Sequence, residues 1–184
     1  MKAVAGSRVV STKPAPWLET LRLDFRALVA DDYADLRTLD QDPRVMRFIA
    51  DGKPRPPEAT ASSLRRFIRY PSLYAGLGVW YATRRDTGAF VGLFVLVYCD
   101  RSLEIEVGYR LDPQAWGQGF ATEGARAIVQ YGFDDLGLHR IIGVTHRDNL
   151  ASQRVLLKAG LDDCGWGRYY GRRLRLFAAD NPRR

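Results

Sequence analysis

The sequence predicts a mixed α+β fold, in which one sheet carries helices on both of its faces. Strand-like and helix-like segments are interspersed along the 184 residues, which favours one mixed sheet over separate layers of one type. Three successive strand patterns in the middle of the chain, joined by short turns, indicate a meander. Hydrophobic residues make up 46% and charged residues 27% of the chain, as is typical of a soluble globular protein with a real core.

The chain is expected to hold one domain over residues 17–180, preceded by a flexible arm over residues 1–16. Pro14 and Pro16 fit poorly into a regular element, which favours the arm. The length suits one domain, and neither an internal repeat nor a low-complexity segment divides it.

The first part of this domain is expected to supply one strand and several helices. Residues 21–28 alternate as a half-buried strand does. Asp31 or Asp32 can cap a helix that continues through Leu36 and Leu39. Two more helices are expected, a short one over 45–49 and a longer one from about 58, with Leu64, Phe67 and Ile68 on one side.

The second part alternates between strands and helices. The central strands are expected at 78–84, 89–98 and 103–111. A helical pattern then runs from 117 to about 136, and Gly137 follows where a terminating glycine belongs. After a strand over 140–145, Asn149 is expected to cap a helix ending at Gly160, and residues 164–178 alternate loosely as further strand.

Composition restricts the partners and the compartment. The net charge of +7 and the isoelectric point of about 9.7 favour an anionic partner: nucleic acid, an anionic membrane or a phosphorylated cofactor. Cys99 and Cys164 form no disulfide framework, and with only His139 and His146 beside them no metal site is expected. Without a signal peptide or an apolar run of about 18 residues, a reduced, cytoplasmic protein that does not enter membranes is expected.

One segment carries a recognisable chemical signal. A strand ends near Leu111, glycines occur at Gly117 and Gly119, and a helix begins directly afterwards. The first turn of a helix presents unpaired N–H groups and a partial positive charge, and glycines let a phosphate approach that backbone. The segment therefore predicts a pyrophosphate site, although a merely tight connection is the alternative. It lacks both the Walker motif and the third glycine of the dinucleotide fingerprint.

The neighbouring residues carry a family resemblance. The segment Gln114-x-x-Gly117-x-Gly119, followed by Phe120-Ala121-Thr122-Glu123, resembles the acyl-CoA signature of the GCN5-related N-acetyltransferases (GNAT). Residues 106–111 are similar to the fourth strand of that family. Residues 18–23 with Asp31-Asp32, and residues 149–160, are similar to motifs of its RimJ/RimL-like ribosomal-protein branch. The resemblance covers about residues 18–165. Leu161 and Gln118 depart from it, since an aromatic residue and a cation are usual at these places.

The resemblance implies a GNAT-like acyl-CoA N-acyltransferase fold, with a mostly antiparallel sheet and splayed central strands over 103–111 and 140–145. It implies acetyl-CoA as co-substrate, bound in the splay. The implied cofactor-binding residues are Tyr109 and Leu111 along the pantetheine, Gln114, Trp116, Gly117, Gln118, Gly119, Phe120, Ala121 and Thr122 around the pyrophosphate, and Asn149 and Ser152 near the sulfur.

The implied chemistry is direct attack of an amine on the thioester, for which two catalytic residues are expected. Glu106 is the candidate base; Glu104 shares its face by strand alternation, and both carboxylates could instead be solvated beside arginines. Ser152 could stabilise the departing thiolate. Alternatively, it could be a residue of the first helical turn without a catalytic role. Tyr169 and Tyr170 are alternative donors, although strand tyrosines are more often packing residues. A backbone N–H near Tyr109 or Leu111 could polarise the carbonyl.

The expected function is N-acetylation of a primary amine, with a protein N-terminus as the leading acceptor. A small-molecule amine or antibiotic, another acyl donor such as succinyl-CoA, and a non-catalytic acyl-CoA sensor are the alternatives. Acceptor choice is expected to depend on residues 31–75 and on the last hairpin, and the cations of loop 51–57 suggest tolerance of acidic surroundings. The cationic and aromatic run over 168–175 suits nucleic acid but also an edge strand, so nucleic-acid binding is not expected as the primary function.

Smaller expectations concern the histidines, one cysteine and assembly. His139 and His146 are expected to be satisfied or solvent-facing loop residues, and Cys164 to be buried or inert. The resemblance also admits a homodimer, which the residues themselves do not predict.

Overall fold

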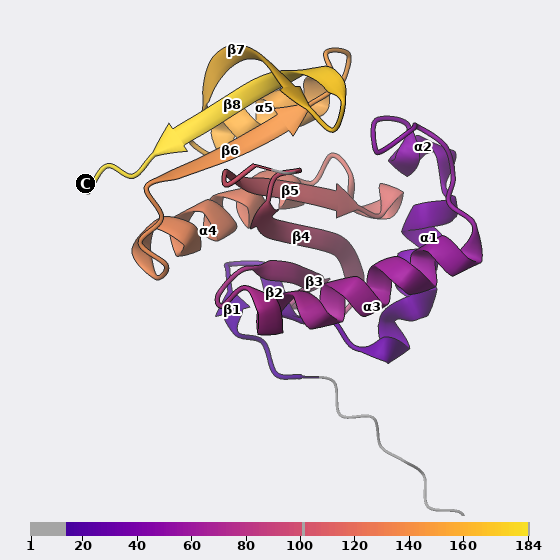
Figure 1. The fold of residues 1–184 in the computed structure, drawn as a ribbon. Coiled ribbons are helices and arrows are strands. Elements are labelled where there is room, and N and C mark those ends of the chain that lie inside the picture. Colours follow the sequence, from indigo (N-terminus) through magenta and orange to yellow (C-terminus); the bar gives the residue numbers. More distant parts are fainter. Residues whose placement is uncertain (1–13, 101, 184) are drawn as a thin grey trace, which may run out of the picture.

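A computed structural model describes residues 14–100 and 102–183 and is built on one eight-stranded sheet (Figure 1). The spatial order of the strands is β1-β2-β3-β4-β5-β6-β8-β7, and every neighbouring pair is antiparallel except β5 with β6. The strands are β1 (Leu18–Glu19), β2 (Leu23–Ala27), β3 (Gly78–Arg84), β4 (Phe90–Tyr98), β5 (Ile105–Leu111), β6 (Arg140–Thr145), β7 (Asp162–Tyr169) and β8 (Arg172–Asp180).

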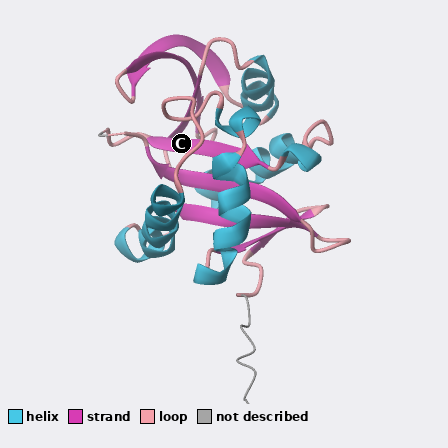
Figure 2. Cartoon of the chain, turned by 90° about the vertical axis from the view of Figure 1, so that its right-hand side faces the viewer, coloured by secondary structure: helices cyan, strands magenta, loops and turns pink. Residues whose placement is uncertain are grey.

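Helices cover both faces of this sheet (Figures 1 and 2). They are α1 (Tyr33–Gln41), α2 (Pro43–Met46), α3 (Pro57–Leu73), α4 (Phe120–Asp134) and α5 (Leu150–Lys158), with 3-10 turns at Ala30–Asp32 and Pro113–Ala115. On one face, Leu36 of α1 and Leu64 of α3 pack with Tyr81 of β3. On the other face, Ile128 of α4 packs in the larger core with Phe94 of β4. The predicted mixed α+β fold is therefore confirmed.

The two central strands separate almost as soon as they meet. Strands β5 and β6 are in register only where Glu106 lies opposite Ile142. By contrast, β4 follows β5 along its whole length, from Tyr98 opposite Ile105 to Gly92 opposite Leu111. A sheet that opens in this way leaves backbone N–H and C=O groups of β5 without partners on β6, which is the splay that the family resemblance implied.

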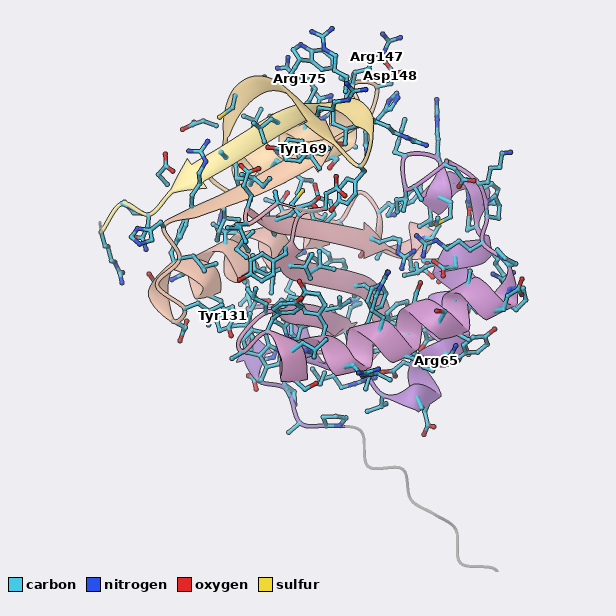
Figure 3. All side chains as sticks on the ribbon, in the orientation of Figure 1. Arg65, Tyr131, Arg147, Asp148, Tyr169 and Arg175 are labelled. Carbon is cyan, nitrogen blue, oxygen red and sulfur yellow. The ribbon has the colours of Figure 1, made fainter. Side chains whose placement is uncertain are left out.

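The β7–β8 hairpin curves back over the same face of the sheet as α1 and α3 (Figure 1). Tyr169 at the end of β7 packs with Ile142 and Val144 of β6, and Figure 3 shows it between the hairpin and β5. The turn itself consists of Tyr170 and Gly171, at φ +53° and +70°. Two positive φ values are typical of a type I′ turn, in which tyrosine is an unusual first residue.

The predicted element order is confirmed, and the bounds of β3 and β6 agree with the prediction. The two-residue β1 was not expected. Ile68 is 39% exposed, although it was expected on the apolar side of α3. Asp32 lies at the start of α1, but its carboxylate forms a buried ion pair with Arg26 instead of capping α1.

Three other expectations concern exposure and the chain ends. Cys164, expected to be buried or inert, is exposed, so it is not buried and its inertness stays a prediction. Most of the expected arm, residues 1–13, lies outside the described residues. Within the described part of the chain, no helix is both long and apolar enough to cross a membrane.

Candidate active site

A cleft of about 1310 Å³ lies where β5 and β6 part. Its walls come from α2 and the loop after it, from the starts of α4 and α5, and from the β7–β8 hairpin. This volume exceeds the roughly 300–1,000 Å³ of a pocket for one small ligand, so the cleft can hold two substrates. The residues predicted as site residues that line it are Glu106, Tyr109, Leu111, Trp116, Gly117, Gly119, Phe120, Ala121, Thr122, Asn149 and Ser152.

The glycine turn leads directly from β5 into α4. Gly117 and Gly119 have φ values of +75° and +84°, and Gly119 is the N-cap residue of α4. Only glycine adopts this left-handed conformation without strain. A Cβ at Gly117 would meet nothing within 4 Å, which leaves the backbone open on that side. The N–H groups of the first helical turn lack intrahelical partners, so the turn is suited to an anion.

Gln114 and Gln118 do not line the cleft. The Gln118 amide donates to the carbonyl oxygen of Gln114 at 2.7 Å, and the Gln114 N–H donates to Asp112 at 2.8 Å. Both residues thus brace the turn from its outer side. The Gln118 side chain and the Gln114 backbone contact the turn itself, and the role of both residues in cofactor binding stays a prediction.

A cation from the start of the chain lies beside this turn. Arg22 donates to the Gln118 carbonyl at 3.0 Å and forms an ion pair with Glu123 of α4 at 2.6 Å. Thr20 also donates to Glu123, at 2.7 Å. Burial by itself would raise the pKa of Glu123, but the hydrogen bonds from Thr20 and Arg22 together outweigh it and lower the pKa. Arg22 was not among the predicted site residues, and its guanidinium, paired with Glu123, lies beside the turn where Gln118 carries no charge.

Alternating residues of β5 face opposite sides of the sheet. Tyr109 faces α4 and α5, and its hydroxyl lies 2.9 Å from the Ser152 hydroxyl in the first turn of α5. The Asn149 side chain caps the same turn by accepting the Ser152 N–H at 3.2 Å. Burial raises the pKa of Tyr109, so this phenol stays protonated and available as a donor.

Glu106 faces the other side, towards α1, α2 and the hairpin. The Tyr170 hydroxyl donates to its carboxylate at 2.5 Å, and Asp100 anchors the turn by accepting the Tyr170 N–H at 2.9 Å. Burial raises the pKa of Glu106, while hydrogen bonds from Tyr170 and Cys99 oppose that rise. The left-handed conformation of Tyr170 costs about 1–2 kcal/mol. In this conformation, the Tyr170 phenol points towards Glu106.

Each of the two carboxylates accepts a hydrogen bond from a tyrosine, which differs from the alternative of solvated carboxylates beside arginines. Glu104 accepts a hydrogen bond from the Tyr169 hydroxyl at 2.9 Å and lines a separate hollow, near Leu103 and Arg140. The two tyrosines therefore each bind one carboxylate, so Tyr170 is not a simple packing residue. Only the Glu106–Tyr170 pair lies in the large cleft.

His146 also lines the cleft, at the end of β6. Its ring stacks on Phe48, with centroids 5.4 Å apart, and its Nδ1 accepts the Asp148 N–H at 3.2 Å. This contact joins the segment after α2 to the segment before α5. His146 thus has a hydrogen-bond partner and a ring contact, as expected of a satisfied loop histidine. It also lies at the edge of the cleft.

Comparison with known proteins identifies the family to which this fold belongs. Residues 22–162 match the family model described as the acetyltransferase (GNAT) domain. The chain belongs to the GNAT acetyltransferase family. The cleft that opens between β5 and β6 is therefore the expected place of its active site, and the enzyme is an acetyl-CoA-dependent N-acyltransferase.

Two relatives illustrate the sequence similarity to other GNAT proteins. The FsC-acetyl coenzyme A-N(2)-transacetylase of Aspergillus fumigatus is 34% identical over 160 residues, which are 83% of this chain and 67% of that protein. The uncharacterized N-acetyltransferase YoaA of Bacillus subtilis is 33% identical over 156 residues, covering 84% of this chain and 88% of YoaA.

Solved structures share the fold at lower identity. An acetyltransferase from Agrobacterium tumefaciens strain C58 superimposes with a TM-score of 0.77 at 21% identity, over 95% of this chain and 99% of that one. The ribosomal L7/L12 α-N-protein acetyltransferase RimL, solved in complex with coenzyme A, gives a TM-score of 0.73 at 15% identity, over 88% and 95% of the two chains.

Proposed function

We propose that this GNAT enzyme transfers the acetyl group of acetyl-CoA to the N-terminal amine of a protein or peptide, as a RimJ/RimL-like enzyme. The observation that carries the proposal is the position of Glu106 in the cleft, on the sheet face opposite to the Tyr109–Ser152 pair. The pKa of this carboxylate, which burial raises, lies nearer to the pKa of an α-amine, about 8, than to that of an alkyl amine, about 10.4.

The donor half would hold acetyl-CoA. Backbone N–H groups of Gly117 to Ala121, at the start of α4, would bind the pyrophosphate, and Arg22 would support the turn through the Gln118 carbonyl. Along the splay, the free backbone of β5 near Tyr109 and Leu111 would pair with the pantetheine amides as an added strand does. This route leads from the glycine turn towards Ser152.

The chemistry would then divide between the two faces of β5. The amine nitrogen attacks the thioester carbon, the new C–N bond forms, and the C–S bond breaks to release coenzyme A as a thiolate. Glu106 accepts the proton that the amine loses, directly or through water. The Ser152 hydroxyl, supported by the Tyr109 phenol at 2.9 Å, stabilises the leaving sulfur by hydrogen bonding.

Removing the Ser152 hydroxyl should slow turnover more than it weakens cofactor binding. We expect Ser152→Ala to lower kcat about 10- to 100-fold, in the lower range for one positioned donor, because leaving-group stabilisation acts mainly in the transition state. The Kd of acetyl-CoA, measured by calorimetry, should change less than about threefold, since the Asn149 cap binds the Ser152 backbone N–H. Equal losses in kcat and affinity would reduce Ser152 to a binding residue.

The experiment that tests the proposed function is a thiol-release screen with the full chain. It compares peptides with free N-termini, the same peptides N-acetylated, polyamines and aminoglycosides, each with acetyl-CoA and succinyl-CoA. We expect release only with acetyl-CoA and free N-termini. Release with a polyamine or an antibiotic would favour the small-molecule alternative, and tight acetyl-CoA binding without release from any amine would favour the sensor.

A further inference from the structure

The part of the cleft that faces α1 and α2 carries charged side chains that lie apart from the glycine turn. Glu106 and Arg110 point to this side, since Val97 and Leu93, directly opposite them on β4, pack with α1 and α3. The anion-binding turn at the start of α4 belongs to the other side of the sheet (Figure 1). Charged residues on the α1 side are therefore placed to meet the acceptor and not the phosphates of the cofactor.

Five arginines line the cleft, and two of them are neutralised. Arg110 is buried against Asp40 of α1, and Arg44 forms an ion pair with Asp42 at 2.6 Å. The other three come from three different segments: Arg47 after α2, Arg55 before α3, and Arg172 at the start of β8. Within residues 14–100 and 102–183, none of these three lies within 4.0 Å of a carboxylate oxygen. The carboxylates lining the cleft are those of Asp51 and Glu106.

Two of these three guanidinium groups, those of Arg47 and Arg55, are placed by contacts other than ion pairs. Arg47 lies over the Phe48 ring, 5.0 Å from its centroid, and Phe48 is itself stacked on His146. Arg55 donates to the Ser63 hydroxyl at 3.0 Å. Burial and the nearby charge of Arg55 both lower the pKa of Arg110, although Asp40 opposes the change, so positive charge is concentrated there.

Arg172 lines the same cleft as Glu106, the proposed proton acceptor. It is two residues from Tyr170, whose hydroxyl binds Glu106 at 2.5 Å, and the tight Tyr170–Gly171 turn keeps both residues at the tip of the hairpin. An acceptor whose amine reaches Glu106 would therefore bring its neighbouring groups beside Arg172. Cations at this place repel polyamines and aminoglycosides and attract carboxylates.

We infer that the acceptor is an acidic N-terminal segment: a free α-amine followed within the next few residues by aspartate or glutamate side chains, which bind Arg47, Arg55 and Arg172. This inference rests on the proposed function and adds the chemical class of its substrate. Arginine suits the role because its planar fork binds carboxylates in a bidentate manner. The two arginines nearest solvent, Arg47 and Arg172, should make the preference dependent on salt.

The test uses three tetrapeptide amides that differ only in charge: Ala-Asp-Asp-Phe, Ala-Asn-Asn-Phe and Ala-Lys-Lys-Phe. Initial rates of thiol release give kcat/KM for each peptide with the full chain. We expect the acidic peptide to exceed its neutral isostere about tenfold at low salt, as several partly exposed charge pairs together would give. The lysine peptide should be the poorest acceptor, and about 0.5 M NaCl should reduce the difference.

Variants assign the preference to these arginines. Arg47→Gln and Arg172→Gln should each lower kcat/KM for the acidic peptide several-fold, should leave the neutral peptide within about twofold, and together should remove the preference. Arg168→Gln is the matched control, because Arg168 lies in the same hairpin, is exposed and does not line the cleft. It should behave as the wild type does.

Other outcomes overturn the inference in distinguishable ways. Equal kcat/KM for the acidic and neutral peptides would exclude an acidic acceptor and leave N-terminal acetylation standing. A rise in the KM of acetyl-CoA, without a change in peptide preference, would assign these arginines to the cofactor phosphates. No thiol release with any of the three peptides would overturn the proposed function and the inference together.

Discussion

Replacing Gly119 by tryptophan should abolish acetyl-CoA binding. The residue is the N-cap of α4 at φ +84° and lines the cleft, so a side chain there occupies the space through which a phosphate approaches the N–H groups. Each hydrogen bond to a charged group contributes about 1.5–3 kcal/mol. Losing two of them weakens binding about 10²- to 10⁴-fold. Calorimetry with acetyl-CoA measures this change.

Gly88→Trp is the matched control for backbone strain. Gly88 lies between β3 and β4, also has a positive φ of +69°, and has no atom within 4 Å of the position that a Cβ would occupy. Both variants force a non-glycine residue into the left-handed region, at a cost of about 1–2 kcal/mol. They should therefore melt at similar temperatures, while only Gly119→Trp loses the cofactor. Micromolar binding by Gly119→Trp would disprove the pyrophosphate site.

The parts of the site that the sequence predicted are local ones. The strand before Gly117 and the helix after Gly119 are adjacent in the chain, so their order already places N–H groups around an anion. The Asn149 cap spans only three residues, to the Ser152 N–H. Patterns of this length can be interpreted from residue type and spacing alone.

The contacts that the sequence did not predict join distant segments. Arg22 reaches Glu123 across 101 positions, and Tyr170 reaches Glu106 across 64. The second contact depends on the curvature of the hairpin, which folds the tip of β7–β8 over β5, and alternation along a strand carries no information about such a bend. A tyrosine followed by glycine, Tyr170-Gly171, was the available signal, because glycine marks the turn.

In the proposed function, strand alternation lets β5 serve both substrates. Tyr109 and Glu106 differ by three positions and so face opposite sides, one towards Ser152 and the other towards Tyr170. One strand with a single opened edge, towards β6, can thus hold a thioester on one face and admit an amine from the other. The same geometry separates the arginines around the acceptor from the glycine turn around the cofactor.

Glu106→Gln should give the largest loss of turnover among conservative substitutions. A positioned general base contributes about 10²- to 10⁴-fold, and glutamine keeps the shape and can still accept the Tyr170 hydroxyl proton in a hydrogen bond. We expect kcat to fall by that factor while acetyl-CoA affinity is retained. Glu104→Gln is the control, because Glu104 is bound by Tyr169 in the same way but lies outside the large cleft.

The pH dependence separates a base from a residue that only positions the amine. A base must be ionised, so activity should rise with pH through the pKa of Glu106, which burial raises above its ordinary value. The pH–rate profile of Glu106→Gln should lose this acid limb. It should keep only the rise that comes from deprotonation of the substrate amine, at about pH 8. Tyr170→Phe removes a hydrogen bond that lowers the pKa of Glu106, so it should move the acid limb to higher pH. An acid limb that persists unchanged in Glu106→Gln would show that another group accepts the proton.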